Sequence, residues 1–426
     1  MIPPAAADRA VITGLGFITP IGNDRATVSA SLRAGTPGLA PVAFLGNPNL
    51  PVKLAGTVKT FSVDSPLWRD WRWPAAYDIP RETIRSLAPH GVYAFCAVTQ
   101  ALADAGLTPA DIANDDRTGL FCASAGSAML LHHNVAAMHA VRGERGNPLG
   151  VVSSIAGTLN FNLAAHFRIT GAVVGFVSAC ASASHALGYA LDELRLGRLD
   201  RVIVIGAEEV NAETLLPFAA MRALSAGTTP ALASRPFDLA RDGFVGAGGA
   251  TALILETATL AAARRKKPYA ELAGWGQSAD GHSVAMSHPE GAGLRRAMTR
   301  ALADARVTPA AIDYVNAHGT STPVGDRAEA LALRAVFTDT GASPVISSTK
   351  GLTGHPLSLA GAMEAGFCAL ALAEGFMPGN PHLVTPDSAC TGLNLPRETT
   401  LRTPQLVLNN SSGFGGSNVC HVLRSA

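Results

Sequence analysis

Aromatic and charged residues are scarce in this chain of 426 residues: Phe, Trp and Tyr make up 6%, and Asp, Glu, Lys and Arg make up 15%. So small a charged fraction is typical of a large globular enzyme, or of an obligate oligomer with a wide apolar interface. The formal net charge is only +1. The chain therefore lacks the broad basic field of a general nucleic-acid-binding protein.

Cysteine is also rare, with six residues spread along the chain. They stand at Cys96, Cys122, Cys180, Cys368, Cys390 and Cys420. No two of them form a C-x-x-C pair, so we predict neither a zinc site nor a thioredoxin-type redox motif, and we expect no metal. The wide spacing in so long a chain also argues against a disulfide framework.

Long hydrophobic runs are missing too. Residues 1–20 have no basic start followed by a long apolar core, so no signal peptide is predicted. Glycine, serine and His185 interrupt the most apolar window, residues 171–190. We interpret that window as a buried strand leading into a buried helix, not as a membrane span. We therefore expect a reduced, cytoplasmic protein that does not span a membrane.

What the chain has in quantity is glycine, 43 residues, together with short β-branched runs that alternate with alanine-rich segments. The runs predict strands at 10–16, 118–125, 173–179, 201–208, 249–256, 269–277, 312–319, 344–349 and 404–410. The alanine-rich segments predict helices at 92–107, 183–197 and 293–305. Strands that alternate with helices indicate an α/β fold with parallel sheets.

The length of the chain and a change of composition at 257–268 indicate two halves, which we place at residues 1–257 and 258–426. The segments ALADAGLTPADI (101–112) and ALADARVTPAAI (301–312) are near copies. Each predicts the end of a helix, a Thr-Pro loop and a following strand, as an internal duplication would produce. Chance similarity between alanine-rich helices explains the match equally well.

One cysteine, Cys180, stands at a predicted junction of strand and helix, in the stretch FVSACASASHALG (176–188). A helix N-terminus carries partial positive charge and unpaired N–H groups, which favour a thiolate and supply a donor for an oxyanion beside the sulfur. Cys180 is therefore a candidate nucleophile. The alternative is a small, inert core side chain. We interpret four other cysteines in that way: Cys96, Cys122, Cys368 and Cys420.

The stretch NAHGTSTPVGD (316–326) places polar side chains just beyond a predicted strand. His318 ends the strand, where the active-site crevice of α/β folds usually lies. The hydroxyl groups of Thr320 and Thr322 can bond an elongated polar ligand. The alternative is a helix-capping loop in which His318 only holds the backbone.

The stretch SSTKGLTGHPLSLAGAMEA (347–365) contains a second group of candidates. Lys350 and His355 lie in a glycine-containing loop between a predicted strand and a helix. Glu364 lies on that helix, where it can orient a neighbour. The alternatives are a solvated lysine and an ordinary helix glutamate.

The stretch NNSSGFGGSN (409–418) carries three glycines, which let the backbone approach a ligand closely. Its N–H groups are candidates for an oxyanion hole, and the alternative is a glycine-rich turn between two strands. No helix follows with the spacing of a dinucleotide-binding motif. One cysteine, two histidines, a lysine and these donors, all at predicted strand ends, together fit acyl transfer with a stabilised oxyanion or enolate.

These four stretches resemble the signature of the β-ketoacyl-acyl carrier protein synthases, the condensing enzymes of fatty-acid and polyketide synthesis. The resemblance runs nearly end to end, from VITGLGFITPIGN (11–23) through SRPFDLARDGFV (234–245) to GFGGSN (413–418). It implies the thiolase fold, in which two similar α-β-α-β-α halves form a five-layered sandwich. That architecture would explain the near repeat. It also implies a dimer.

The resemblance further implies roles for individual residues. Cys180 would be the nucleophile that carries the acyl chain, and His318 and His355 would bind the malonyl thioester carbonyl during its decarboxylation. Lys350 would support the charge of this group, and Glu364 would brace it. The remaining implied roles are an oxyanion hole from the backbone N–H groups of Cys180 and Phe414, contacts of Thr320 and Thr322 with the phosphopantetheine arm, and a carrier-protein docking patch at Arg81 and Arg85. No cofactor is implied beyond the phosphopantetheine of the acyl carrier protein, which is the implied partner.

The chain departs from the pattern of the fatty-acid synthases at three places. Ser412 stands where those enzymes usually have a phenylalanine that gates the acyl pocket, which makes the motif more like that of polyketide ketosynthases. GHPLSLAG replaces the common GHSLGAAG, so Pro356 and Ser358 stiffen and thicken the loop beside His355. Glu82 lies between the two docking arginines, where a basic residue is expected. We hypothesise an unusual acyl substrate, such as a polyketide or polyene chain.

Several other functions compete with this interpretation. The chain could be a ketosynthase subunit that is active only in a heterodimer with a chain-length-factor-like partner, or a non-catalytic partner itself, although such partners usually lack the cysteine. Thiolases use a second cysteine in their glycine-rich motif, whereas Cys420 lies beyond the glycines here. Initiating synthases have asparagine in place of the second histidine, which is His355 in this chain. A cysteine hydrolase is a more distant alternative.

Overall fold

The computed structural model describes residues 8–426. Its strands are β1 (Ala10–Ile18), β2 (Leu39–Pro41), β3 (Leu54–Gly56), β4 (Thr118–Ala123), β5 (Val173–Phe176), β6 (Arg201–Glu208), β7 (Gly249–Thr257), β8 (Ala270–Ala279), β9 (Tyr314–Asn316), β10 (Val345–Ser347), β11 (Leu406–Gly413) and β12 (Ser417–Arg424). Its α-helices are α1 (Arg25–Ala34), α2 (Arg81–Ile84), α3 (Pro89–Ala105), α4 (Ala128–Ala140), α5 (Gly150–Ser154), α6 (Thr158–Phe167), α7 (Ser182–Arg195), α8 (Ala212–Ala220), α9 (Pro230–Ala233), α10 (Ala258–Ala263), α11 (Ala292–Asp304), α12 (Pro323–Val336), α13 (Lys350–Thr353) and α14 (Ala360–Glu374). Short 3-10 helices are η1 (Ala43–Leu45), η2 (Trp68–Asp70), η3 (Pro109–Asp111), η4 (Pro309–Ala311), η5 (Thr338–Thr340), η6 (Leu357–Leu359) and η7 (Ser388–Cys390).

The main sheet has the strand order β10-β9-β11-β12-β8-β1-β7-β6-β4-β5 within the described residues. It consists of two five-stranded halves that meet at a short antiparallel contact, where Ala10–Ile12 of β1 pairs with Ala270–Leu272 of β8. Reading outward from this contact, one half runs β1-β7-β6-β4-β5 and the other runs β8-β12-β11-β9-β10. The two orders correspond strand for strand, as an internal duplication requires.

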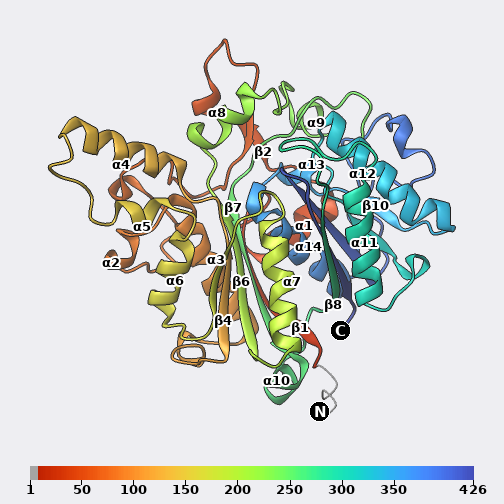
Figure 1. Cartoon of the computed structure of the whole chain (residues 1–426), viewed down its shortest axis with the longest axis horizontal. Coiled ribbons are helices and arrows are strands. Elements are labelled where there is room, and N and C mark those ends of the chain that lie inside the picture. Colours follow the sequence, from red (N-terminus) through yellow and green to blue (C-terminus); the bar gives the residue numbers. More distant parts are fainter. Residues whose placement is uncertain (1–7) are drawn as a thin grey trace.

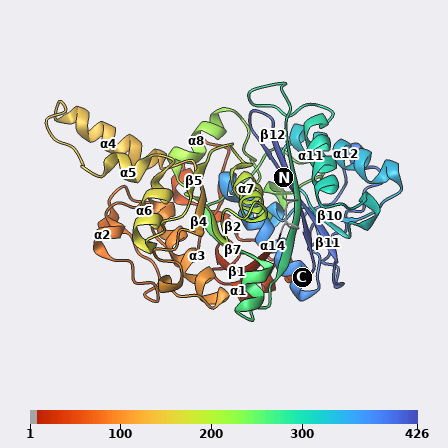
Figure 2. The same ribbon diagram turned by 60° about the horizontal axis from the view of Figure 1, so that its bottom comes forward.

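Helices and sheets alternate in layers. Figure 2 shows α3 and α6 outside one half of the sheet, α7 and α14 in the middle, and α11 and α12 outside the other half. The central helices contact each other and strands of both halves, and α14 is buried along almost its whole length. Figure 1 shows the same arrangement with the N-terminal half in red to green and the C-terminal half in teal to blue. This is the thiolase fold that the resemblance implies.

The near-repeated segments occupy equivalent places in the two halves. Residues 101–112 form the end of α3 and then η3, and residues 301–312 form the end of α11 and then η4. α3 packs on β1, and α11 packs on β8. The two segments therefore have equivalent positions and contacts in the two halves, which favours duplication over chance similarity.

Each predicted strand and helix is present, with ends shifted by a few residues. The prediction of parallel sheets was only partly right. β4, β5 and β6 are parallel, as are β9, β10 and β11, but β7 and β12 run antiparallel to their neighbours. The difference arises in part because β12 follows β11 through a tight hairpin, and a hairpin can join only antiparallel strands.

One helical stretch, Leu357–Glu374, is long and apolar enough by composition to cross a membrane. Within this fold 83% of it is buried, because it is the central helix between the two half-sheets. The apolar window at 171–190 forms β5 and the first part of α7, as predicted. The prediction that this strand is buried was wrong, because β5 lies at the edge of the sheet and Val173 and Val174 are exposed.

Candidate active site

Cys180 lies at a sharp turn between β5 and α7. Ala179 has a left-handed backbone conformation with φ of 51°, which is uncommon for a residue with a side chain. The turn is held by a 2.8 Å hydrogen bond from the Ser178 N–H group to the Ser182 hydroxyl and by another from the Ala181 N–H group to the Ser178 carbonyl. Such strain at one position is typical of a functional turn. It presents the thiol at the N-terminus of α7.

His355 faces this thiol directly. Its Nε2 atom lies 3.0 Å from Cys180 Sγ. The backbone of His355 is fixed on both sides, because its N–H group donates to Val245 at 2.7 Å and its carbonyl accepts from Ala247 at 3.0 Å. These backbone hydrogen bonds therefore hold the imidazole close to the sulfur.

His318 completes the pair of imidazoles. Its ring centre is 5.2 Å from that of His355, and the two rings are nearly perpendicular. His318 follows β9, and its N–H group and that of Gly319 donate to the two carboxylate oxygens of Glu329 at 2.9 and 2.6 Å. The Asn410 side chain adds a 3.1 Å hydrogen bond to the same glutamate. Glu329 therefore orients the loop that carries His318.

Lys350 and Glu364 form a buried ion pair, in which Lys350 Nζ contacts Glu364 Oε1. Both side chains are almost completely inaccessible to solvent. The solvated lysine and the ordinary helix glutamate are thus excluded as interpretations. Burial raises the pKa of Glu364 to about 7, although the positive charge of Lys350 lowers it. The carboxyl group is therefore partly protonated at neutral pH.

Burial sets the protonation of the reactive groups. It raises the pKa of the Cys180 thiol to about 12, while the Lys350 charge and backbone N–H donors pull it down. Burial, with Lys350 beside both rings, holds the pKa values of His318 and His355 well below the usual range. Both histidines are therefore neutral at pH 7 and able to donate one ring N–H group each. Within residues 8–426 the Nδ1 atom of each ring has no hydrogen-bond partner.

The glycine-rich stretch forms the hairpin of β11 and β12 and lies against the Cys180 turn. The backbone N–H group of Phe414 lies beside the Cys180 sulfur and lowers the pKa of its thiol. This approach needs a glycine at position 413, because a Cβ atom there would lie 2.7 Å from the Ser178 carbonyl oxygen. The stretch is thus both a turn between strands and a source of donors beside the sulfur.

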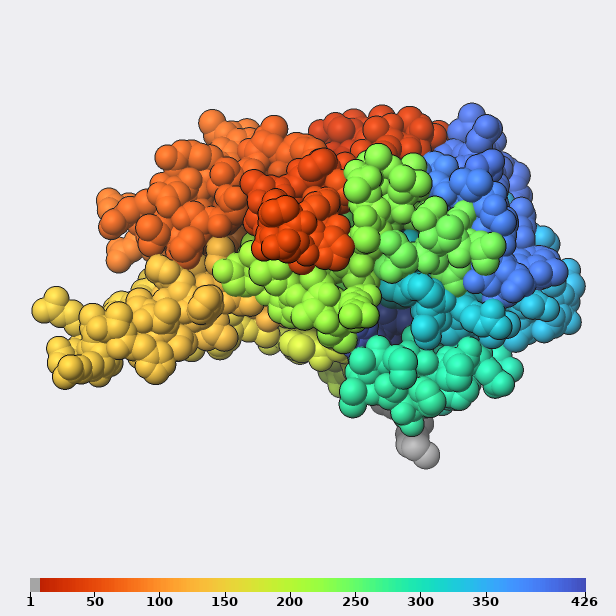
Figure 3. Space-filling model, turned by 90° about the horizontal axis from the view of Figure 1, so that it is seen from above, coloured from red at the N-terminus to blue at the C-terminus, as the bar shows by residue number. Residues whose placement is uncertain are grey.

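A cavity of about 410 Å³ opens onto these groups. Figure 3 shows a hollow whose floor is formed by dark-blue C-terminal residues, between green, cyan and teal segments. Its lining brings together most of the predicted site: Cys180, His318, His355, Thr320, Thr322, Ser412 and Phe414. The Thr320 and Thr322 hydroxyls lie 3.0 Å apart.

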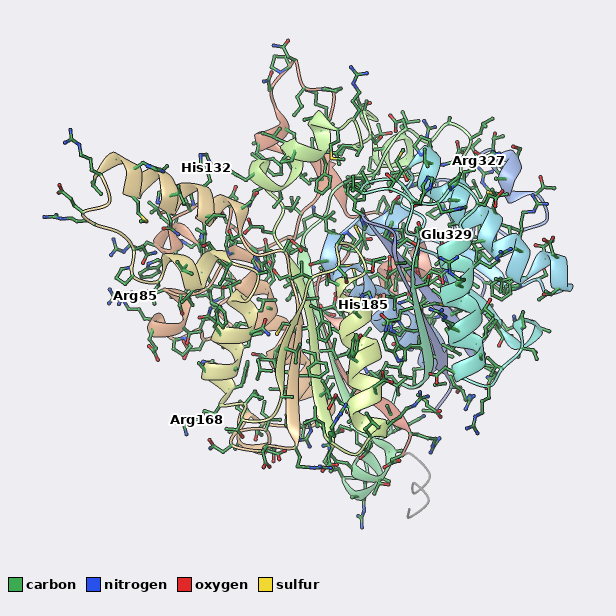
Figure 4. The ribbon with its side chains drawn as sticks, viewed as in Figure 1. Arg85, His132, Arg168, His185, Arg327 and Glu329 are labelled. Carbon is green, nitrogen blue, oxygen red and sulfur yellow. The ribbon has the colours of Figure 1, made fainter. Side chains whose placement is uncertain are left out.

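Arg81 and Arg85 lie elsewhere and are exposed, Arg81 at the start of α2 and Arg85 just after its end. Figure 4 shows Arg85 at the outer edge of the N-terminal half, remote from Glu329. The sequence prediction missed Glu329, because a glutamate within a helix carries no mark of its contact with a distant loop. It also missed Phe218 and Phe244, which line the cavity. Within residues 8–426 there is no cluster of three or more histidine, cysteine or acidic side chains suited to a metal ion.

Family models match most of the chain. The model described as "Beta-ketoacyl synthase, N-terminal domain" matches residues 7–261, and the one described as "Beta-ketoacyl synthase, C-terminal domain" matches residues 269–384. The chain therefore belongs to the β-ketoacyl synthase family, whose members are acyl-transferring condensing enzymes.

Individual relatives agree with this assignment. The 3-oxoacyl-[acyl-carrier-protein] synthase 1 of Haemophilus influenzae is 40% identical over 424 residues, and that of Escherichia coli K12 is 39% identical over 422 residues. Each alignment covers 98% of both chains.

Solved structures are also similar. A β-ketoacyl synthase from Burkholderia phymatum has a TM-score of 0.90 at 31% identity, covering 98% of this chain and 100% of that one. The ishigamide ketosynthase/chain length factor has a TM-score of 0.86 at 29% identity, and AntDE:AntF, a type II polyketide ketosynthase in complex with its acyl-carrier protein, has 0.86 at 26%. Both cover 99% of this chain and 100% of the other.

Proposed function

We propose that this chain catalyses decarboxylative condensation of malonyl-carrier protein with an acyl chain held as a thioester on Cys180. The observation that carries the proposal is the 3.0 Å approach of His355 Nε2 to Cys180 Sγ, with a second neutral imidazole at right angles to the first. A nucleophile with two neutral ring donors suits an enolate, which carries its charge on one oxygen.

In the first half-reaction the Cys180 sulfur attacks the acyl thioester carbonyl. The backbone N–H groups of Cys180 and Phe414 receive the negative charge of the tetrahedral oxygen. When the intermediate collapses, the carbon–sulfur bond to the carrier breaks, and the thiol proton leaves with the carrier sulfur. The acyl group is then bonded to Cys180.

In the second half-reaction the malonyl thioester oxygen accepts ring N–H groups of His318 and His355. The bond to the terminal carboxylate breaks, carbon dioxide leaves, and the electron pair forms an enolate held by these donors. Its carbon attacks the acyl-enzyme carbonyl, and collapse of that intermediate returns Cys180 as a thiolate. Lys350, braced by Glu364, supplies positive charge beside this thiolate.

The carrier and its prosthetic arm occupy the outer part of the site in this proposal. Thr320 and Thr322 contact the phosphopantetheine arm, since their hydroxyls line the cavity. Arg81 and Arg85 dock the acidic carrier protein, because both are exposed, one at each end of the short helix α2. Glu82 between them weakens the positive charge of the patch. Because docking depends on exposed charges, it is expected to weaken as the salt concentration rises. No metal or other cofactor takes part.

The chain acts in the cytoplasm as a homodimer or as a heterodimer with a related synthase subunit. The edge strand β5 supports a dimer, because it lies at the free end of the sheet with its side chains partly exposed. The ishigamide ketosynthase/chain length factor is among the structures similar to this chain. The two halves of each chain divide at residues 257 and 258.

The acyl chain is proposed to be a polyketide or polyene intermediate. Ser412, where the resemblance led us to expect a gating phenylalanine, lines the cavity, and its hydroxyl donates to Asn418 Oδ1 at 2.8 Å. The hydroxyl is therefore held within the hairpin, and no large side chain stands beside the thiol at that position. The pocket wall is more polar and more open than a phenylalanine would leave it. Housekeeping fatty-acid elongation is the alternative, favoured by the names of the relatives.

Intact-protein mass spectrometry with a panel of acyl-carrier proteins, followed by malonyl-carrier protein, tests the function. We expect an acyl adduct on the wild-type chain, its loss in Cys180→Ala, and a β-ketoacyl product longer by two carbons. A plain preference for saturated fatty acyl chains would remove the polyketide assignment alone. No adduct from any donor would indicate a subunit that needs a partner, and adding a chain-length-factor-like subunit would then separate an inactive scaffold from half of a heterodimer.

A further inference from the structure

Ser358, three residues after His355, makes a buried contact with the opposite half of the site. Its hydroxyl donates to Glu208 Oε1 at the end of β6. The Ala125 N–H group donates to the same oxygen at 3.0 Å, from the loop after β4. Two strand ends and the His355 loop therefore meet at one carboxylate.

The local packing leaves little freedom for this arrangement. Leu359 Cα lies only 3.0 Å from the position that a Cβ atom on Gly206 would occupy, so η6 rests directly on β6. Leu357 between the two functional residues has a φ of 48°, a left-handed conformation that costs energy in a residue with a side chain. A strained loop of this kind needs contacts on its far side to hold it. The Ser358–Glu208 bond is such a contact.

We propose that Ser358 and Glu208 are a positioning pair that holds the His355 imidazole in register with Cys180 for malonyl decarboxylation. The proposal rests on the role assigned to His355 above. The pair acts through the loop and does not touch the reacting atoms. Its physical basis is that a misplacement of about 1 Å in a catalytic group can cost about 100-fold in rate. The synthases that the chain resembles commonly have glycine at position 358, which cannot form this hydrogen bond.

Glu209, the residue after Glu208, takes part in a similar hydrogen bond that serves as a control. Ser127 donates to Glu209 Oε2 at 2.8 Å, and both side chains are buried. This second Ser–Glu bond has the same chemistry and burial as the first. It joins the N-cap of α4 to the residue after β6, and the Ser127 hydroxyl also accepts from the Leu130 N–H group at 3.2 Å. Its loss therefore reports at least the general cost of removing a buried hydrogen bond.

The test compares Ser358→Ala, Ser358→Thr, Glu208→Gln and Ser127→Ala, each with the full-length chain. Two rates are measured by mass spectrometry: decarboxylation of malonyl-carrier protein, and acyl transfer to Cys180. We expect Ser358→Ala to lower kcat for decarboxylation by about 10- to 100-fold, with KM for the carrier unchanged and acyl transfer within about threefold. Ser358→Thr keeps the hydroxyl and restores the rate. Glu208→Gln keeps a neutral acceptor for the Ser358 hydroxyl, so we expect its decarboxylation rate to lie between those of the wild type and Ser358→Ala. The double variant Ser358→Ala/Glu208→Gln should lose no more of this rate than Ser358→Ala alone.

The proposal is overturned if Ser358→Ala matches Ser127→Ala in both rates. It is also overturned if Ser358→Ala lowers both rates equally together with the melting temperature, since that pattern indicates general destabilisation. His355→Ala separates this failure from that of the proposed function. If His355→Ala retains decarboxylation, the role of His355 is wrong, whatever Ser358 does.

Discussion

At the scale of the residue, the Cys180 thiol lies where two influences oppose each other. Burial raises its pKa to about 12, and the charge of Lys350 lowers it. The thiolate fraction at neutral pH, and hence reactivity, therefore depends on how much of the Lys350 charge Glu364 leaves uncompensated.

This balance predicts opposite effects for the two members of the ion pair. Lys350→Met should slow alkylation of Cys180 by iodoacetamide about tenfold, since one pKa unit changes the thiolate fraction tenfold. Glu364→Gln should accelerate it, because the remaining lysine charge is no longer neutralised. Labelling at Cys180 is followed by peptide mass spectrometry, with Lys53→Met as a control for loss of a surface charge. Slower labelling in both variants would show that the pair acts by packing and not by charge.

Glu208 provides a second prediction at this scale, for stability against pH. Burial raises its pKa from 4.5 to about 7, so between these values the folded chain binds a proton that the unfolded chain has released. The stabilisation from that proton is complete below pH 4.5 and is lost as pH rises through about 7. The free energy of unfolding should therefore fall less steeply with pH in Glu208→Gln, by up to about 1.4 kcal/mol per pH unit. Urea unfolding at pH 5, 6 and 7, at one protein concentration, measures the two slopes. Equal slopes would show that Glu208 is ionised in the folded protein throughout this range.

At the scale of the element, the hairpin of β11 and β12 sets the position of the Cys180 turn. A Cβ atom at Gly413 would meet the Ser178 carbonyl at 2.7 Å and the Cys180 nitrogen at 3.1 Å. Gly415, two residues on, has a φ of 80° but no atom within 4 Å of a Cβ position. One glycine is thus required for contact with the turn, the other only for backbone conformation.

Gly413→Ala should therefore reduce acyl-enzyme formation about 100-fold by displacing Cys180, the proposed nucleophile. Gly415→Ala should cost about 1–2 kcal/mol of stability and leave acyl transfer nearly intact. Acylation rates and urea unfolding of both variants distinguish these effects. If Gly415→Ala is the slower enzyme, the flexibility of the turn and not its contact with Cys180 governs acylation.

At the scale of the whole molecule, the edge of the sheet stays open in one chain. β5 ends the ten-strand order, and Val177 just after it is 70% exposed. Other exposed apolar side chains lie on the neighbouring helix α6 and on α4. Figure 3 shows the segment around α4 in gold, extending away from the rest of the molecule. An uncovered strand edge with apolar neighbours is unfavourable in water, so this surface fits a dimer contact.

If the chain forms the dimer proposed above, Val174→Asp on β5 should convert it to monomers, because the substitution places a charge in the apolar strand contact. Light scattering coupled to size-exclusion chromatography measures the mass. Val284→Asp, at a valine that is 89% exposed in the loop after β8, is the control and should leave the mass unchanged. A wild-type monomer, or a Val174→Asp dimer, would contradict a β5 interface.

The sequence by itself determined the local elements and the candidate residues of the site. Strand and helix segments depend on periodicity and composition, and the four motifs carry their reactive groups within a few residues, so Cys180, His318, Lys350 and His355 could all be selected from short stretches. The near repeat was consistent with two similar halves, but in the sequence alone chance similarity explained it equally well. The relative direction of β7 and β12 could not be read in this way, because periodicity does not record how strands pair.

Only the tertiary structure decided which side chains act on one another. Glu329 beneath His318, the Lys350–Glu364 pair and the Ser358–Glu208 contact each join segments that are 10 to 150 residues apart. The shifted pKa values have the same origin, since burial exists only once both halves have packed around α7 and α14. Local chemistry chose the reactive residues, and long-range packing determined their protonation, their distances and their partners.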